Sequence, residues 1–338
     1  MNLAELRIKH AAECLKAGGV VAFPTETVYG LGADAFNPQA VAAVFELKNR
    51  PFFDPLIVHI ASLEQMDALV KAIPPKAQKL IAKFWPGPLT IILPKRDKVP
   101  DIVTAGLRGV GIRMPAHPVA LELIRMAGTP VAAPSANKFG KLSPTCARHV
   151  ADEFGTRDFE IIDGGPCRVG VESTIISFMN EAPVLLRPGG IAVEEIEQAI
   201  GPVIIPAPGE CAMMSPGRAE RHYSPRTRII LDSSIERMPK HYSVGLLTFI
   251  PIEDMIKYDA VEVLSRTGAF REAAANLFSA LRHLDAAHLD VIIANRLPET
   301  GLGRTINDRL TRMSVENEKQ TKVRDVYDLN DLDKTWQT

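Results

Sequence analysis

The chain has 338 residues, more than one hydrophobic core usually holds, so we expect two domains. Apolar residues make up 46% of it and charged residues 23%, which is typical of a folded globular protein and not of a disordered or fibrous one. The 39 basic and 40 acidic side chains nearly cancel, so the composition gives no global electrostatic reason to expect binding to nucleic acid or to a membrane surface.

The cysteines and the apolar runs indicate where the protein works. The four cysteines are widely spaced, with no C-x-x-C pair and no histidine at zinc-finger spacing, so we expect reduced thiols and no metal site built by the protein. No stretch approaches 18 uncharged apolar residues, and the N-terminus lacks the basic and apolar regions of a signal peptide. These features predict a cytoplasmic protein without a membrane span.

Residues 1–205 alternate between helical and strand patterns, which predicts an α/β domain. A helix is expected over residues 3–17, stopped by two glycines, and the short apolar run at 20–23 predicts a strand that is central in a sheet. Asn37 and Pro38 predict the start of the next helix.

Two further helix starts and six further strands are expected in this domain. Ser62 and Gln65 have the spacing of a capping box, and Ser143 precedes a proline as the cap of a later helix. The apolar runs that predict strands lie at 56–60, 89–93, 110–114, 130–133, 174–178 and 184–186.

Residues 206–227 contain four prolines and no sustained period, which predicts a linker. Residues 228–338 form the second predicted domain, smaller and also α/β, with a long helix that places Leu277, Leu281 and Leu284 on one face. Its strands are expected at 228–231, 244–249, 261–264 and 290–295.

Polar or glycine-rich turns directly follow several predicted strands of the first domain. They lie at residues 24–32, 132–137, 170–174 and 185–190. Ligands of open α/β sheets bind beyond the strand ends, so several such turns in one domain predict a lined cavity. No P-loop, no G-x-G-x-x-G after a strand and no H-E-x-x-H occurs, so a nucleotide would have to be held in another way.

Each of these segments also has a simpler interpretation when taken alone. Residues 24–32 fit a polar turn equally well, and the basic residues at 48–50 could simply complement the dipole at a helix end. A single histidine in a strand, such as His59, is more often a hydrogen-bonded core residue than a ligand.

Together the segments resemble the threonylcarbamoyl-AMP synthase family, whose catalytic unit is the YrdC domain. The family's Lys-x-Arg and Ser-x-Asn signatures appear in order as residues 48–50 and 135–137, preceded by the Pro-Thr-Glu-Thr-Val-Tyr-Gly-Leu-Gly segment at 24–32. The Ser-Pro-Gly at 215–217 and the His-Tyr-Ser-Pro at 222–225 resemble the linker of the long, two-domain form. The resemblance covers nearly the whole chain.

The resemblance implies a fold and a reaction. The fold is a twisted open α/β sheet with a deep cavity, joined to a smaller Rossmann-like α/β domain. The reaction condenses L-threonine, bicarbonate and ATP to threonylcarbamoyl-AMP, pyrophosphate and water, so the enzyme would be a nucleotidyltransferase. The product would pass to the machinery that transfers the threonylcarbamoyl group to tRNA, and Mg²⁺ is expected with the ATP.

The resemblance also assigns roles to individual residues. Lys48 and Arg50 are the expected catalytic residues, because they can balance the charge of bicarbonate and triphosphate. The residues expected to bind threonine are Thr27, His59, Arg113 and Ser173. Those expected to bind ATP are Arg50, Asp54, Ser135, Asn137, Ser143, Arg187 and Tyr223.

Two positions depart from the family pattern, and two receive no role. Asp54 stands where many relatives carry Asn, and Arg218 where the residue is often Met. Glu172 and Lys138 have no role beyond local polarity. Residues 206–227 are expected to cover the cavity as a gate, because Tyr223 and the prolines lie there.

Two other functions compete with the synthase. An RNA-binding module is one, because the same domain type is associated with double-stranded RNA, but the near-zero net charge counts against it as the sole activity. A contact with RNA in addition to synthesis stays open. A carbamoyl-transfer maturation factor is the other, and the absence of paired cysteines counts against it.

Overall fold

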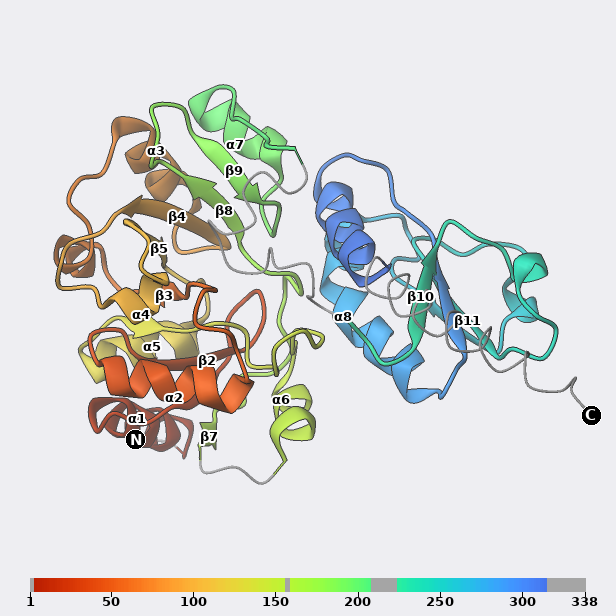
Figure 1. The fold of residues 1–338 in the computed structure, drawn as a ribbon, viewed down its shortest axis with the longest axis horizontal. Coiled ribbons are helices and arrows are strands. Elements are labelled where there is room, and N and C mark those ends of the chain that lie inside the picture. The colour runs from red at the N-terminus through yellow and green to blue at the C-terminus, as the bar shows by residue number, and fades with distance from the viewer. Residues whose placement is uncertain (1–2, 156–158, 208–223, 315–338) are drawn as a thin grey trace, which may run out of the picture.

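The computed structural model describes residues 3–155, 159–207 and 224–314. These residues form two α/β lobes that lie side by side (Figure 1), one built on a nine-stranded sheet and one on a four-stranded sheet. The expected fold class is confirmed. The domain boundaries at 205, 206–227 and 228 stay a prediction, since residues 208–223 lie outside the described part of the chain.

The first sheet is mixed, with strand order β7-β1-β2-β6-β3-β5-β4-β8-β9. The β1–β7, β3–β5 and β4–β8 pairs are parallel and the others are antiparallel. Its strands are β1 (Val21–Phe23), β2 (Gly30–Asp34), β3 (Ile57–His59), β4 (Leu89–Pro94), β5 (Gly109–Arg113), β6 (Val131–Ala132), β7 (Glu160–Ile161), β8 (Thr174–Ser177) and β9 (Val184–Arg187).

Helices cover this sheet through apolar stripes. α1 (Leu3–Lys16) and α5 (Pro118–Ala127) share one core cluster, while α2 (Pro38–Lys48), α3 (Pro75–Phe84) and α7 (Val193–Ile200) contribute to another that contains the middle strands. The burial of their apolar faces supplies the main favourable free energy of the fold. Three shorter elements complete the lobe: η1 (Leu63–Ala68), α4 (Asp101–Thr104) and α6 (Ala147–Phe154).

The strand and helix-cap predictions need four corrections. β2 was predicted as a turn; it is a strand because its two glycines lie close to the Phe23 ring, where a Cβ at Gly32 would be only 2.7 Å from a ring carbon. β1 is internal, next to the two-residue edge strand β7, and is not central. The Ser62 side chain makes no capping bond, and Gln65 accepts from the backbone N–H of Ala61 instead of that of Ser62. Ser143 does not cap α6, which begins after Cys146.

Alternation along the middle strands separates the core from the opposite face of the sheet. Val58 of β3 lies in the core cluster under the helices, so Ile57 and His59 point to the other face. β3 is parallel to β5, and the register places His59 beside Arg113. Two polar side chains of distant sequence segments therefore lie together on the face opposite the core formed with α2, α3 and α7.

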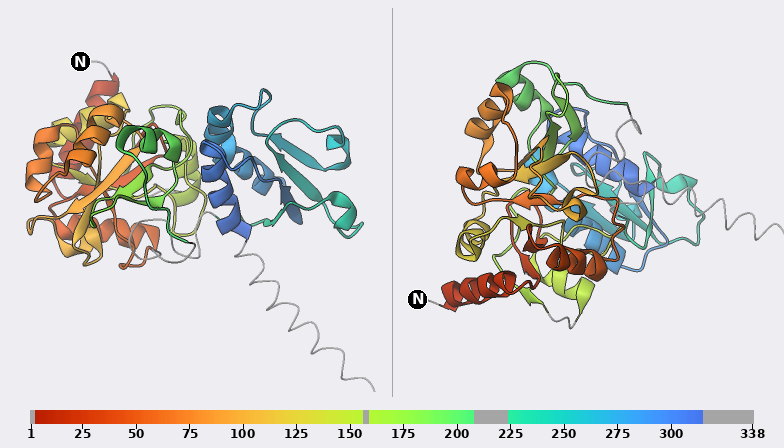
Figure 2. Two further views of the ribbon diagram at one scale, coloured as in Figure 1. Left: turned by 90° about the horizontal axis from the view of Figure 1, so that it is seen from above. Right: turned by 60° about the vertical axis from the view of Figure 1, so that its left-hand side comes forward.

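The second lobe contains a fully parallel sheet with strand order β10-β13-β11-β12. Its strands are β10 (Arg228–Leu231), β11 (Val244–Thr248), β12 (Ala260–Val263) and β13 (Val291–Ala294), with the short helices η2 (Ile235–Arg237) and η3 (Met255–Lys257) between them. Helix α8 (Phe270–Ala286) and the helical residues 302–314 lie on the side of this sheet that faces the first lobe (Figures 1 and 2).

The two lobes share a hydrophobic core. Val28, Leu142 and Val171 of the first lobe belong to the same buried cluster as Leu277 and Phe278 of α8. The second lobe therefore packs against the loops at 24–32 and 170–174, which the sequence had assigned to a cavity. An interface with an apolar core favours a fixed arrangement of the two lobes.

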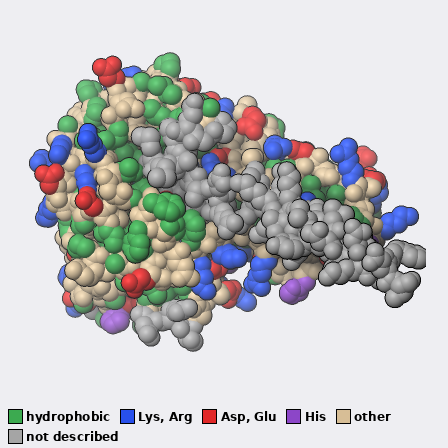
Figure 3. Space-filling view, in the orientation of Figure 1, with side chains coloured by type: hydrophobic (Ala, Val, Ile, Leu, Met, Phe, Trp, Pro, Cys, Tyr) green, Lys and Arg blue, Asp and Glu red, His purple; other side chains and the backbone are tan. Residues whose placement is uncertain are grey.

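The surface is mixed in charge. On the face drawn in Figure 3, acidic and basic side chains are interspersed over the first lobe, in line with the net charge of −1. Within the described residues, no helix is both long and apolar enough to cross a bilayer.

Candidate active site

A cavity of about 540 Å³, counting the space at its mouth, opens at the predicted place in the first lobe. Its walls come from the loop after β1, from β3 and β5, and from the segments that follow β6, precede β8 and end β9. The lining residues are Thr25, Thr27, Val28, Tyr29, Gly30, Arg50, Ile57, His59, Arg113, Ala133, Pro134, Ser135, Glu172, Ser173 and Arg187. All four turns predicted from the sequence thus contribute to one cavity.

His59 lies on the cavity wall with its ring almost fully buried, edge-on to Phe23 at 5.9 Å between ring centroids. Burial, helped by the positive charge of Arg113, lowers the pKa of His59 to about 3, so the ring is neutral near pH 7. Its Nδ1 has no hydrogen-bond partner among the described residues. A neutral imidazole with a free nitrogen can bind a polar ligand without adding charge.

Arg113 is held in place by three groups around the same wall. Its Nε donates to the carbonyl of Gly87 at 3.2 Å, its Nη1 donates to Thr27 Oγ1 at 2.8 Å, and its Nη2 lies 2.8 Å from the Glu26 carboxylate. A guanidinium has five N–H donors, so these contacts leave donor capacity for a ligand carboxylate. The buried Glu26 balances the arginine's charge, a pairing the sequence did not predict.

Ser173 and Arg187 also line the cavity and contact each other. The Arg187 Nη2 donates to the Ser173 carbonyl at 2.9 Å and to its Oγ at 3.2 Å. The Ser173 Oγ also lies 2.7 Å from Thr90 Oγ1 on β4. The predicted threonine residue Ser173 and the predicted nucleotide residue Arg187 are therefore in direct contact.

Arg50 lines the cavity, and its own loop orients it. Its Nη2 lies 2.8 Å from Asp54 Oδ2, and the guanidinium also donates to the carbonyls of Asp54 and Pro55. Asp54 therefore balances the charge of Arg50, and it is not among the lining residues. A carboxylate at this position is compatible with an anion site because an arginine already pairs with it.

Lys48 is buried behind the cavity wall. Its Nζ donates to the carbonyls of Ser135, at 2.6 Å, and Asn137. Burial, together with the charge of Arg50, lowers the pKa of Lys48 well below its usual value. The Lys-x-Arg and Ser-x-Asn signatures are therefore joined by a lysine that holds the second signature's backbone.

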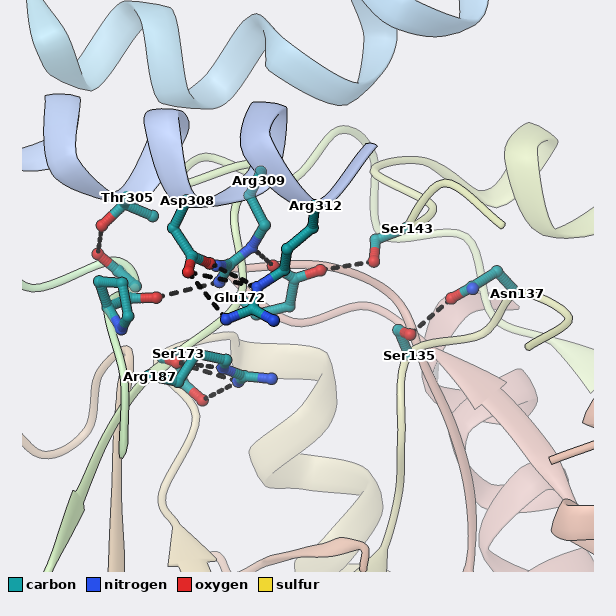
Figure 4. A network of polar contacts seen from close by, with 12 residues as sticks. Ser135, Asn137, Ser143, Glu172, Ser173, Arg187, Thr305, Asp308, Arg309 and Arg312 are labelled. Carbon is teal, nitrogen blue, oxygen red and sulfur yellow. Dashed lines mark hydrogen bonds and ion pairs between the residues drawn. The ribbon is translucent and has the colours of Figure 1, made fainter. Parts of the chain in front are cut away.

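Asn137 also lies behind the wall. Its Nδ2 donates to the carbonyls of Lys138 and Lys141, and its Oδ1 accepts from Ser135 Oγ at 2.5 Å. These bonds fix the Ser135 hydroxyl at the cavity (Figure 4).

Glu172, which received no role from the sequence, lines the cavity and connects both lobes. Its Oε1 accepts from Ser143 Oγ at 2.5 Å, and its Oε2 accepts from Arg309 Nε at 2.9 Å (Figure 4). Its position directly before Ser173 was the only signal in the sequence. The partner Arg309 lies 137 residues further along the chain, so no local pattern could have identified the pair.

The structure brings most of the predicted residues together. Those on the wall are Thr27, Arg50, His59, Arg113, Ser135, Ser173 and Arg187. Those behind the wall, in contact with wall residues or with the adjoining backbone, are Lys48, Asp54, Asn137 and Ser143. Tyr223 lies outside the described residues, as do Arg218 and most of the predicted gate.

The cavity offers little to a metal ion. Within the described ranges, no group of three or more His, Cys, Asp or Glu side chains could hold one. The single lining carboxylate, Glu172, is already bonded to Ser143 and Arg309. A magnesium ion in this cavity would therefore take most of its oxygen ligands from phosphate and water.

Comparison with known proteins agrees with this geometry. Residues 13–189 match the model of a family described as "Telomere recombination", the Sua5–YciO–YrdC type, and residues 191–314 match "Threonylcarbamoyl-AMP synthase, C-terminal domain". The threonylcarbamoyl-AMP synthase of Pyrococcus abyssi is 45% identical over 93% of this chain and 95% of its own length. The chain belongs to the threonylcarbamoyl-AMP synthase family.

Two further relatives show how far the similarity extends. The threonylcarbamoyl-AMP synthase of Bacillus subtilis is 46% identical over 90% of this chain and 92% of its own length. The crystal structure of P. abyssi Sua5 complexed with L-threonine superimposes with a TM-score of 0.84 at 43% identity, covering 93% of this chain and 95% of that one. The family resemblance read from the sequence and the two-domain form are both confirmed.

Proposed function

We propose that this chain is an L-threonylcarbamoyladenylate synthase that uses ATP as a nucleotidyltransferase. The observation that carries the proposal is the cavity itself, in which parallel register places His59 beside Arg113, and Arg187 contacts Ser173. Arg113 suits an amino-acid carboxylate, while Arg50, Ser135 and Arg187 offer cationic and hydroxyl groups to phosphate. The relative from P. abyssi, solved with L-threonine, supports the same assignment.

In the proposed reaction the threonine amine attacks bicarbonate and water leaves, giving a carbamate. A carbamate oxygen then attacks the α-phosphorus of ATP. Pyrophosphate leaves as the bond between the α-phosphorus and the oxygen bridging to the β-phosphate breaks. Threonine would be held by Thr27, His59, Arg113 and Ser173, and ATP by Arg50, Ser135 and Arg187, with Asp54, Asn137 and Ser143 supporting them from behind. Such a reaction needs positioning and charge balance more than covalent help from the protein.

Several parts of the proposal go beyond the cavity. Lys48 would act by holding the Ser135–Asn137 backbone that faces the nucleotide. Magnesium would enter with the triphosphate, and Tyr223 would contact the nucleotide from the linker. The product would pass to the machinery that modifies tRNA, in the cytoplasm, and a direct contact with RNA stays a prediction.

The decisive experiment measures pyrophosphate release with ATP in the presence and absence of threonine and of bicarbonate. Release should require both, because neither the carbamate nor its adenylate forms without them. Equal release without threonine would contradict the proposal. Arg113→Lys serves as the variant, since it keeps the charge but loses the fork that binds a carboxylate with two N–H groups, so it should raise the KM for threonine about tenfold or more.

A further inference from the structure

The carboxylate of Glu172 is an unusual group for this cavity. It is 6% exposed and lines a space that, under the proposed function, must admit a triphosphate. An unbalanced carboxylate there would repel phosphate and would itself be costly to bury. Something must therefore neutralise it.

Arg309 of the second lobe supplies that charge. Its side chain is fully buried, and its Nε donates to Glu172 Oε2 at 2.9 Å. Burial tends to raise the pKa of Glu172, but Arg309, then Arg187 and the Ser143 hydroxyl outweigh it, so the pKa lies below its usual value and the group stays ionised. The pair is neutral as a whole.

The same arginine also connects two loops of the first lobe. Its Nη2 donates to the carbonyl of Pro188 at 3.0 Å, directly after β9, while Glu172 directly precedes Ser173 and β8. Four residues earlier on the same helical face, Thr305 donates to the carbonyl of Gly189 at 3.0 Å. Ser173 and Arg187, which touch each other on the cavity wall, lie between these anchored points (Figure 4).

Arg309 is itself fixed within its helix. Asp308 accepts from Arg309 and, at 2.9 Å, from Arg312. Contacts within its own helix thus hold the guanidinium in the orientation in which it binds the first lobe.

We propose that Arg309 is a positioning residue for the nucleotide side of the cavity. It neutralises Glu172 and ties together the loops that carry Ser173 and Arg187, so the second lobe completes the active site without touching the reacting atoms. This inference rests on the proposed use of ATP.

The test is a double-mutant cycle on the full-length protein. The affinity of each variant for ATP with magnesium is measured by calorimetry. Arg309→Met removes the ion-pair partner of Glu172 and should weaken ATP binding at least tenfold. Glu172→Gln removes the negative charge from the cavity and leaves Arg309 paired with Asp308, so it should not weaken ATP binding. Glu172→Gln with Arg309→Met should bind ATP within about threefold of Glu172→Gln. The matched control is Arg304→Met, on the same helix. Arg304 pairs at 3.3 Å with the exposed Glu194, and neither residue lines the cavity, so its loss should leave ATP binding unchanged.

Two results would overturn the inference. A lower melting temperature for Arg309→Met with unchanged ATP affinity would mean that the arginine only stabilises the interface. A double variant no better than Arg309→Met would mean that the charge of Glu172 is not what Arg309 controls. If Arg309→Met does not fold, Arg309→Lys and the double variant decide, and a tenfold loss in both would contradict the inference.

The two proposals fail in different ways. Calorimetric binding does not depend on turnover. A wild-type protein that binds ATP but releases no threonine-dependent pyrophosphate would contradict the proposed reaction alone.

Discussion

Three buried arginines in this protein each pair with a buried carboxylate. Arg50 pairs with Asp54, Arg113 with Glu26, and Arg309 with Glu172. Removing one member of such a pair leaves a charge in a medium that solvates it poorly, which typically costs about 3 to 5 kcal/mol. The arginines of the cavity are thereby held in position before any ligand arrives, which lowers the entropy lost on binding.

The lowered pKa of His59 makes the stability of the folded protein depend on pH. The folded protein holds this ring neutral down to about pH 3, while the unfolded chain protonates it near the ordinary value of 6.5. The contribution of the neutral His59 ring to the free energy of unfolding is therefore complete above pH 6.5. It is lost progressively as the pH falls toward 3, by up to about 1.4 kcal/mol per pH unit.

Replacing His59 should remove this dependence. The free energy of unfolding of His59→Asn, measured by urea titration, should fall less between pH 6.5 and pH 4 than that of the wild type. The comparison at pH 8, where the ring is neutral in both states, gives the part of the substitution's effect that does not depend on pH. Parallel pH curves for the two proteins would show that His59 ionises freely in the fold.

At the scale of elements, the Lys-x-Arg signature lies at the C-terminal end of helix α2, next to the cavity. Asn49 ends the helix in the left-handed conformation, with φ of 51°, which turns Arg50 back toward the wall. At the other end Asn37 caps the helix, because its side chain accepts from the backbone N–H groups of Gln39 and Ala40, both at 3.1 Å. Both ends were marked in the sequence by residues that favour these conformations.

Loss of the Asn37 cap should destabilise the protein without changing the site chemistry. Asn37→Ala should lower the free energy of unfolding by about 1 kcal/mol, since two backbone donors lose their acceptor. Asn37→Asp is the control, because its carboxylate can accept the same bonds and suits the positive end of the helix dipole. Equal losses for Ala and Asp in urea titrations would show that the capping bonds contribute nothing.

At the scale of the whole molecule, the two lobes fit together without space for an extra methyl group. Gly170 has φ of 73°, and a Cβ there would lie 2.4 Å from the Cα of Ala275 on α8. Gly170 is therefore required both by its backbone conformation and by the approach of the second lobe.

Gly170→Ala should accordingly force the lobes apart. Gly106→Ala is the matched control, because φ of 75° imposes the same left-handed strain, about 1 to 2 kcal/mol, while nothing lies within 4 Å of the added Cβ. Gly170→Ala should lose a further 1 to 3 kcal/mol or so by overpacking and should split a single calorimetric unfolding transition into two. Identical melting curves for the two variants would contradict close packing at Gly170.

Much of the fold follows from local patterns in the sequence. The apolar runs that became β4, β5, β8 and β9 are too short for helices and too apolar for exposed strands, and Asn37 with Pro38 marks a helix start by its own chemistry. Glycine-rich β2 was missed, because its strand conformation is imposed by packing against Phe23 and not by propensity. The capping box at Ser62 was wrong because Gln65 bonds to Ala61, and the cap at Ser143 was wrong because its hydroxyl donates to Glu172.

The sequence by itself determined the family, the two-domain α/β organisation and most of the cavity wall, since the Lys-x-Arg and Ser-x-Asn signatures and the strand-end turns are contiguous in the chain. Only the tertiary structure decided that Lys48 lies behind the wall and that Glu172 belongs to the site. It alone could pair Glu172 with Arg309, because a buried charge selects its partner by distance in space, and 137 residues of chain separate the two.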